Sequence, residues 1–224
     1  MGEYYDWVNV DRKEYICPND FDFGNKRLES MGRGNVFLCA LRELLSKEWA
    51  GDHVIFLGDE VLVPADSDNE TLKTLYGHTV QAGDPGVAFT AQIETYINVS
   101  GLFKASEAEV RPEIEFYLED LKNNKPMAHN EYGVDASDPF AGLFLRTGKD
   151  FRYTINHTKR VCYSFTETKI LCPDHAQNDF VDPLPILMAY GCVSETGIWV
   201  GDIIGVGDKI PDGYVLLKEI VLDW

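Results

Sequence analysis

Hydrophobic and polar positions alternate near both ends of the chain, and this pattern predicts β-strands. Residues 6–10 alternate loosely, and residues 13–17 return after a charged turn, which predicts a β-hairpin. Residues 151–165 predict a second hairpin in the same way, and the mostly apolar residues 214–222 predict a final, internal strand. Each hairpin is followed by an apolar segment and a short buried strand, so both ends predict a hairpin–helix–strand unit.

The helix and the strand that follow each hairpin can be placed from the same pattern. Asn35 is the expected N-cap of a helix that has one apolar face and ends near Glu48. A buried strand is predicted next, at residues 54–57. In the second unit, residues 183–190 predict a shorter helix and residues 203–206 predict the strand.

The segment between the two units, residues 66–149, has a different pattern. Ser106 as N-cap and Glu109 at the third helical position predict a capping box. Apolar residues then recur at helical spacing from Pro112, and residues 123–126 are expected to end that helix. This segment therefore predicts a largely helical insert.

The two units also repeat the same residues in the same order. Each has an asparagine in its hairpin, then a Trp-x-Gly-Asp segment, then a Gly-Asp pair, and fixed-order self-similarity indicates a duplicated supersecondary unit. The repeated positions are Asn9, 49–52 and 58–59 in the first unit, and Asn156, 199–202 and 207–208 in the second.

These patterns predict an α+β fold. We expect two copies of the hairpin–helix–strand unit, related by a pseudo-twofold axis, around a shared and mostly antiparallel sheet. The first repeat unit is predicted at residues 1–65, the helical insert at 66–149 and the second repeat unit at 150–224. Because the two units together can bury a core that one unit could not, we expect all three to form one compact domain.

The charge of the chain narrows the classes of partner. The 224 residues carry 37 Asp and Glu against 20 Lys and Arg, a formal net charge of −17. Such a field repels nucleic-acid phosphates and anionic membranes but attracts a basic protein; it can also serve solubility alone. The first residues lack a signal peptide, and no apolar run has the length of a membrane helix, so we expect a cytoplasmic protein.

Sequence motifs of common catalytic and cofactor sites are absent. The chain has no P-loop, no Gly-x-Ser-x-Gly segment and no dinucleotide-binding glycine motif that opens a helix. Its five cysteines form no Cys-x-x-Cys pair, so neither a disulfide framework nor a four-thiolate zinc site is indicated. We therefore expect no cofactor, and the sequence favours a non-enzymatic protein over an enzyme.

The repeated Gly-Asp carboxylates are the candidate site. If they converge across the pseudo-twofold axis, they could bind a divalent cation or transfer protons, with His53 or His175 nearby. The structural alternative is that Trp anchors the core, Gly allows a tight turn and Asp bonds its own turn. The candidate metal or acid–base residues are Asp52, Asp59, Asp202, Asp208 and His175.

The second unit resembles a group of small uncharacterised bacterial proteins. The resemblance rests on an Asn-His-Thr-Lys hairpin, a Pro-Leu-Pro segment, a Trp-x-x-Asp segment and an Ile-Pro-x-Gly-Tyr segment. The first unit resembles related bacterial sequences through its hairpin and its Trp-Ala-Gly-Asp segment. This resemblance implies no activity, and it transfers no catalytic residue. The matching segments of the second unit are residues 155–159, 183–185, 199–202 and 210–214.

Three functions follow from these patterns. The first is a non-enzymatic acidic protein of the immunity or inhibitor type, which neutralises a basic protein such as a nuclease toxin. The second is a metal-dependent enzyme that uses the duplicated carboxylates. The third is a structural or oligomeric module whose interface is the 66–149 insert. The sequence does not indicate an oligomeric state.

Overall fold

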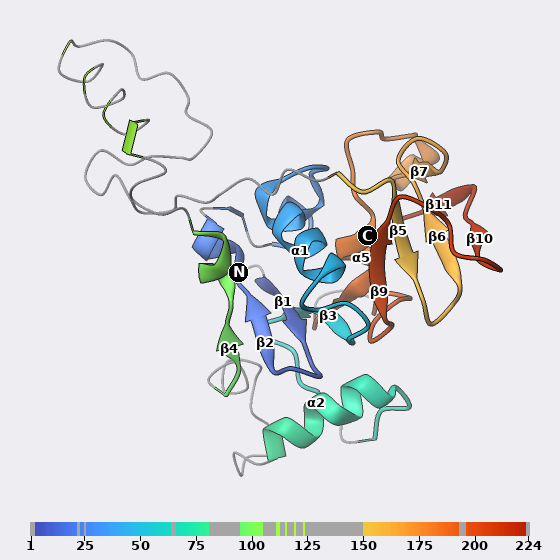
Figure 1. Ribbon diagram of the computed structural model, residues 1–224. Helices are drawn as coiled ribbons and strands as arrows, with labels where there is room; N and C mark the ends of the chain where they lie inside the picture. Colours follow the sequence, from blue (N-terminus) through green and yellow to red (C-terminus); the bar gives the residue numbers. More distant parts are fainter. Residues whose placement is uncertain are drawn as a thin grey trace.

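The chain folds into an α+β structure, as predicted (Figure 1). No helix of the described residues is long and apolar enough to cross a membrane. The computed structural model describes residues 3–21, 23, 24, 26–63, 66–80, 95–104, 111, 112, 115, 119, 123, 150–192 and 196–222.

The first hairpin belongs to a five-stranded sheet. Its strand order is β4-β2-β1-β3-β8, with β2 and β3 antiparallel to the central β1 and with β4 and β8 added in parallel at the edges. The strands are β1 (Tyr5–Asn9), β2 (Glu14–Ile16), β3 (Val54–Gly58), β4 (Ile97–Asn98) and β8 (Ala189–Tyr190).

The second hairpin belongs to a four-stranded sheet of similar order, β10-β6-β5-β9. Here β6 and β9 are antiparallel to the central β5, and β10 is parallel to β6. A separate parallel pair joins β7 to β11. The strands are β5 (Tyr153–Asn156), β6 (Val161–Tyr163), β7 (Lys169–Leu171), β9 (Ile204–Gly207), β10 (Val215–Leu216) and β11 (Glu219–Val221).

The prediction of one shared sheet is wrong, because each hairpin has its own sheet. The two sheets approach at an isolated antiparallel bridge between His53 and Ile203, the residues that precede β3 and β9. The second half of the chain nevertheless completes the first sheet, since β8 pairs with β3. The final strand predicted at 214–222 is also two strands, β10 and β11, which pair with different partners.

Two longer helices cover opposite faces of the first sheet. α1 (Val36–Ser46) begins at the predicted cap, where the Asn35 side chain accepts a hydrogen bond from the Leu38 amide at 2.8 Å. α2 (Glu70–Val80) lies in the predicted helical insert, although no helix was placed at these residues; its Leu72 and Leu75 pack on the other face. α1 also packs against β9 of the second sheet, and Figure 1 shows it between the two sheets.

The short helices complete the connections. α5 (Leu184–Met188) is the short helix predicted in the second unit, and it packs against β3 of the first sheet. The helix predicted from Pro112 lies almost wholly outside the described residues. The 3-10 turns are η1 (Pro18–Phe21), η2 (Glu29–Met31), η3 (Ser100–Phe103) and η4 (Pro173–His175).

One hydrophobic core unites the two ends of the chain. It contains both tryptophans of the repeated segments, Trp49 and Trp199, together with Trp7, Tyr163 and Ile204. A smaller core lies between the opposite face of the first sheet and α2. Because the main core draws on both units, neither unit can bury its apolar face without the other.

A buried ion pair also joins the two ends. Arg42 of α1 donates to Asp182, just before α5, with a distance of 2.8 Å from Nη2 to Oδ2. The Arg42 and Asp182 side chains are only 8% and 1% exposed. The other oxygen of Asp182 accepts from the Tyr163 hydroxyl at 2.6 Å and from the Leu184 amide at 3.0 Å. Burial raises the pKa of Tyr163 well above its usual value, so the phenol remains a donor.

Replacing Asp182 with Asn is expected to lower the free energy of unfolding by about 3 kcal/mol, because it leaves the Arg42 charge buried without its counterion. Urea unfolding measures the loss. The double variant Arg42→Met/Asp182→Asn removes both charges and should recover part of it. The single variant Arg42→Met completes the comparison. If the double variant lost as much free energy of unfolding as the two single variants together, this account would be contradicted.

Candidate functional site

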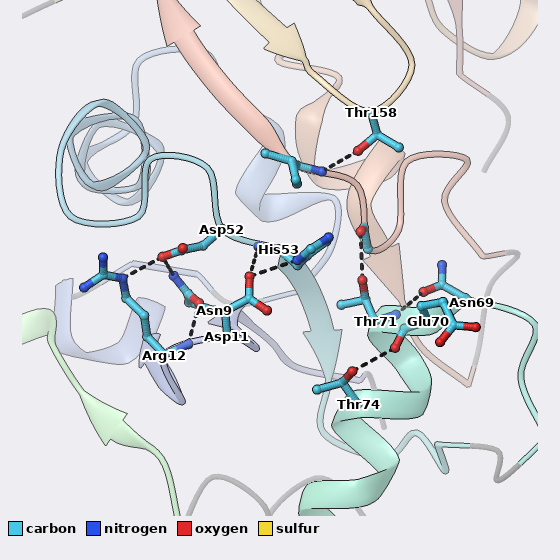
Figure 2. Close-up of polar contacts among 12 residues, drawn as sticks. Asn9, Asp11, Arg12, Asp52, His53, Asn69, Glu70, Thr71, Thr74 and Thr158 are labelled. Atoms are coloured by element: carbon cyan, nitrogen blue, oxygen red, sulfur yellow. Dashed lines mark hydrogen bonds and ion pairs between the residues drawn. The ribbon is translucent and has the colours of Figure 1, made fainter.

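The first repeated aspartate closes a polar cluster at the end of the first hairpin. Asp52 Oδ2 accepts a hydrogen bond from the Asn9 side-chain amide at 2.9 Å. The same oxygen forms an ion pair with Arg12 Nε at 2.6 Å. Asn9 is fully buried, and its side-chain oxygen accepts from the Arg12 backbone amide at 3.0 Å. The asparagine therefore ties the hairpin turn to the start of β3 (Figure 2).

The second repeated aspartate closes a cluster with the same contacts. Asp202 accepts from the Asn156 amide at 2.7 Å and from Lys159 Nζ at 2.5 Å. The Asn156 side chain is fully buried and accepts from the Lys159 backbone amide at 2.8 Å. The two clusters differ in one group, because Lys159 provides the cation that Arg12 provides in the first.

Backbone geometry explains the residues around each cluster. Gly51 and Gly201 precede the two aspartates and have φ angles of 89° and 77°, a region that costs glycine little. Lys13 and Arg160 occupy the same place in the two hairpin turns, with φ angles of 56° and 54°. The repeated Trp-x-Gly-Asp segment is thus a turn that presents its carboxylate to the hairpin asparagine.

The two clusters meet at the bridge between His53 and Ile203. Each of these residues follows a repeated aspartate, so each pairs with its own counterpart, as a twofold axis through the bridge requires. The His53 amide donates to Asp11 Oδ2 at 2.7 Å, and the Ile203 amide donates to Thr158 Oγ1 at 2.9 Å. These matched contacts follow the sequence repeat, whereas its origin by duplication stays a prediction.

A histidine–carboxylate pair occurs on the first side of this bridge only. His53 Nδ1 lies 2.8 Å from Asp11 Oδ2, and both side chains are about 40% exposed (Figure 2). A carboxylate on Nδ1 leaves Nε2 as the nitrogen available for proton transfer or for a ligand. Comparison of the two repeat units did not identify Asp11 as a candidate. Its counterpart in the second unit, Thr158, accepts, among the described residues, only from the Ile203 backbone amide.

The candidate carboxylates do not assemble into a metal site. In the described part of the chain, no group of three or more His, Cys, Asp and Glu side chains could hold a metal ion. Asp52 and Asp202 are each occupied by a cation and an amide. Asp59 lies at the other end of β3, where it accepts from the Tyr4 amide at 3.0 Å. Asp208 likewise follows β9.

The loop that carries the candidate His175 also lies apart from these clusters. His175 ends η4 with a φ angle of 56°, and its side chain is exposed. Cys172 is buried, and burial raises the pKa of its thiol, which opposes the thiolate form that binds metals.

The N-terminal end of α2 is anchored on the second repeated turn, residues 199–202. The Asn69 side-chain amide donates to the Val200 carbonyl at 2.8 Å, and the Thr71 hydroxyl donates to the Gly201 carbonyl at 2.9 Å (Figure 2). A Cβ on Gly201 would lie 2.7 Å from Asn69 Oδ1, so this glycine also allows the close approach. The turn therefore holds α2 against the first sheet.

A half-buried carboxyl group, Asp6, lies on β1 close to Cys17. Burial raises the pKa of Asp6 to about 7, opposed by a hydrogen bond from the Cys17 thiol and assisted by the charges of Asp20 and Asp59. Burial and the Asp6 charge in turn raise the pKa of Cys17 to about 12, so the thiol stays protonated. The alternation of residues 6–10 placed Asp6 on the strand but gave no sign of this environment.

His157 marks a place where the two halves differ. It occupies the position of the buried Val10, and its Nδ1 lies 3.1 Å from the Tyr214 hydroxyl. A Cβ on Gly205 would lie 2.6 Å from His157 Nε2, so the ring rests directly on the glycine. Partial burial lowers the pKa of His157. The ring fills the space over β9, and the contacts describe a packing role.

The most exposed large apolar side chain of the described residues is Phe180, at 84%. Its turn is nevertheless held firmly against η2. The Phe180 amide donates to Asn178 Oδ1 at 2.9 Å, its carbonyl accepts from the Arg33 amide at 2.8 Å, and Val181 forms a bridge with Gly32. The backbone is fixed, and the ring projects from it.

Comparison of the chain with models of protein families, with curated proteins and with solved structures found no match.

Replacing Asp202 with Ala is expected to lower the free energy of unfolding by about 2 kcal/mol, because the buried Asn156 amide loses its acceptor. Asp52→Ala should cost less, since Asp52 is more exposed than Asp202. Urea unfolding measures both, with Asp212→Ala, at an exposed carboxylate, as a surface control. If the clusters are structural, millimolar Mg²⁺ or Mn²⁺ should leave the urea unfolding midpoint of the parent chain unchanged. An increase in that midpoint that disappears in Asp202→Ala would contradict this.

The raised pKa of Asp6 predicts a pH-dependent stability difference. Between about pH 4 and pH 7 the unfolded chain loses this proton while the folded chain keeps it, so the contribution of Asp6 to stability falls as the pH rises. Asp6→Asn removes this cost.

At pH 8 the Asp6→Asn variant should therefore be more stable than the parent chain by about 4 kcal/mol, and at pH 4 the two should be nearly equal. Urea unfolding across this range measures the difference. The control is Asp68→Asn, an exposed carboxyl whose replacement should give a small difference at every pH. A difference for Asp6→Asn that does not change with pH would contradict the assignment.

Proposed function

We propose that this chain is a non-enzymatic acidic binding protein of the immunity or inhibitor type, which neutralises a basic protein. The observation that carries the proposal is the exposed Phe180 on its fixed turn, in a chain with a net charge of −17. Proteins use a few large side chains as the energetic centre of an interface and use charge to steer the partner.

The turn suits an interface because its geometry is set before a partner arrives. Hydrogen bonds hold the backbone on both sides of Phe180, because its amide donates to the Asn178 side chain and its carbonyl accepts from the Arg33 amide. Asp182, two residues further on, donates its amide to the Met31 carbonyl at 2.7 Å and is itself locked by Arg42. Binding would therefore immobilise little more than the phenyl ring, which keeps the entropic cost low.

The surroundings of Phe180 favour a basic partner. Asp179 precedes it and is positioned by Gln177, whose amide donates to Asp179 Oδ1 at 2.8 Å. Leu28, which is about half exposed, precedes η2, and Arg33, whose amide donates to the Phe180 carbonyl, lies just after η2. An apolar centre with a carboxylate beside it matches a partner surface that has an apolar pocket and Lys or Arg at its rim.

The two other functions have less support. The enzyme alternative needs carboxylates that converge, whereas Asp52 and Asp202 are each engaged by a hairpin asparagine and a cation. The oligomeric module would use the 66–149 insert, most of which lies outside the described residues, so that alternative stays a prediction.

The test is capture of a partner by the immobilised full chain at low salt, followed by purification of that partner and titration by calorimetry. We expect a basic protein that binds with one-to-one stoichiometry and binds more weakly as salt is raised. Phe180→Ala should weaken binding by about 30-fold, the effect of losing a central aromatic side chain.

The matched control is Ile198→Ala, which removes another exposed apolar side chain, 70% exposed, outside this turn. It should leave the affinity unchanged. Capture of no basic protein at low salt, or equal affinity of the parent chain and Phe180→Ala, would reject the proposal.

A further inference from the structure

A hollow of about 380 Å³ opens between the start of the second unit and Arg33, which lies two residues after η2. It is lined by the two cationic side chains Arg33 and Arg152, by Asp150 and Asp208, by the hydroxyls of Ser164 and Thr166, and by two phenyl rings. Its volume is in the range of small-molecule sites. Neither the repeat nor the proposed protein-binding turn accounts for this combination of groups.

Arg33 is held so that its donors remain available. Its guanidinium carbon lies 4.1 Å from the centre of the Phe165 ring. Stacking on a ring occupies the face of a guanidinium and leaves the N–H groups at its edge. Among the described residues, the guanidinium of Arg33 has no hydrogen bond or ion pair, so its donors can bind a carboxylate in two-point fashion.

The Phe165 ring that contacts Arg33 also lies near a second, buried arginine. The guanidinium carbon of the buried Arg42 lies 5.2 Å from the same ring centre. Arg42 Nη1 is buried and has no hydrogen-bond partner among the described residues, although Nη2 is paired with Asp182. Arg42 thus adds a second positive charge close to the Phe165 side of the hollow.

The hydroxyl groups and the second arginine are also fixed. Ser164 is 2% exposed, and its Oγ lies 3.0 Å from Thr166 Oγ1 and accepts from the Thr166 amide at 3.3 Å. Arg152 is held by Glu167, with 3.0 Å from Nη2 to Oε2. These groups can add hydrogen bonds to a ligand without a large ordering cost.

The carboxylates of the hollow set the charge that the ligand must carry. Asp150 and Asp208 are exposed and oppose the two arginines, so a ligand with anionic groups alone would meet repulsion. A ligand with one carboxylate and one ammonium group can satisfy both signs. The phenyl rings provide apolar contact for the remainder of such a molecule.

We propose that this hollow binds a free α-amino acid with an apolar side chain. Its carboxylate binds Arg33, its ammonium group lies toward Asp150 and Asp208, and its side chain lies beside the phenyl rings of Phe151 and Phe165. This proposal is independent of the protein-binding function, because that function rests on the projecting ring of Phe180.

Calorimetric titration of the full chain tests the proposal with three matched probes. L-phenylalanine carries both charges, 3-phenylpropionate carries only the carboxylate, and phenethylamine carries only the ammonium group. We expect saturable binding of L-phenylalanine with a Kd below about 10 mM and at least tenfold weaker binding of the other two. No saturable binding of L-phenylalanine, or equal binding of either single-charge probe, would overturn the proposal.

Variants place the binding in the hollow. Arg33→Gln and Asp150→Asn should each weaken L-phenylalanine binding at least tenfold, whereas Lys104→Gln, which removes an exposed charge elsewhere, should not. Circular dichroism confirms that each variant is folded before titration. Phe180→Ala should retain full amino-acid affinity, which separates this site from the protein interface. Unchanged affinity in Arg33→Gln would overturn the assignment.

Discussion

The buried ion pair between Arg42 and Asp182 is the interaction on which the rest of the structure depends. It joins a helix of the first half to the start of a helix in the second half, and both charges are almost wholly removed from water. Such a pair is costly to bury and more costly to break, so it favours one relative placement of the two halves. The Phe180 turn ends at Asp182, and Phe165 lies over Arg42, so both proposed binding surfaces are built around this pair.

The two hairpins illustrate a different use of polar groups. A fully buried asparagine in each hairpin receives the turn amide on its oxygen and gives its own amide to a carboxylate. That arrangement gives hydrogen-bond partners to the buried asparagine side chain and to a turn amide, and the cation on the carboxylate balances its charge. The repeated aspartates are therefore explained by backbone geometry, which leaves the differences between the halves as the places to look for chemistry.

Local patterns predicted the local structure well. The hairpins, the Asn35 cap, α1, β3, α5 and β9 follow from alternation, helical spacing and turn residues that act over a few positions. The sheet arrangement could not be predicted in this way, because the two-residue edge strands β4, β8 and β10 are set by distant partners. The same limit applies to Asp6, Phe180 and the hollow, whose character depends on burial that the fold alone creates.

The bridge between His53 and Ile203 has a consequence for how this protein can vary. In a symmetric homodimer, the two residues that meet on the axis are encoded once and must be identical. Here one chain supplies both sides, and the covalent connection keeps them together at a high effective concentration. Histidine can therefore face isoleucine, and Asp11 on one side can take the role that Thr158 has on the other. A single chain of this form can keep a symmetric framework and still carry one asymmetric face.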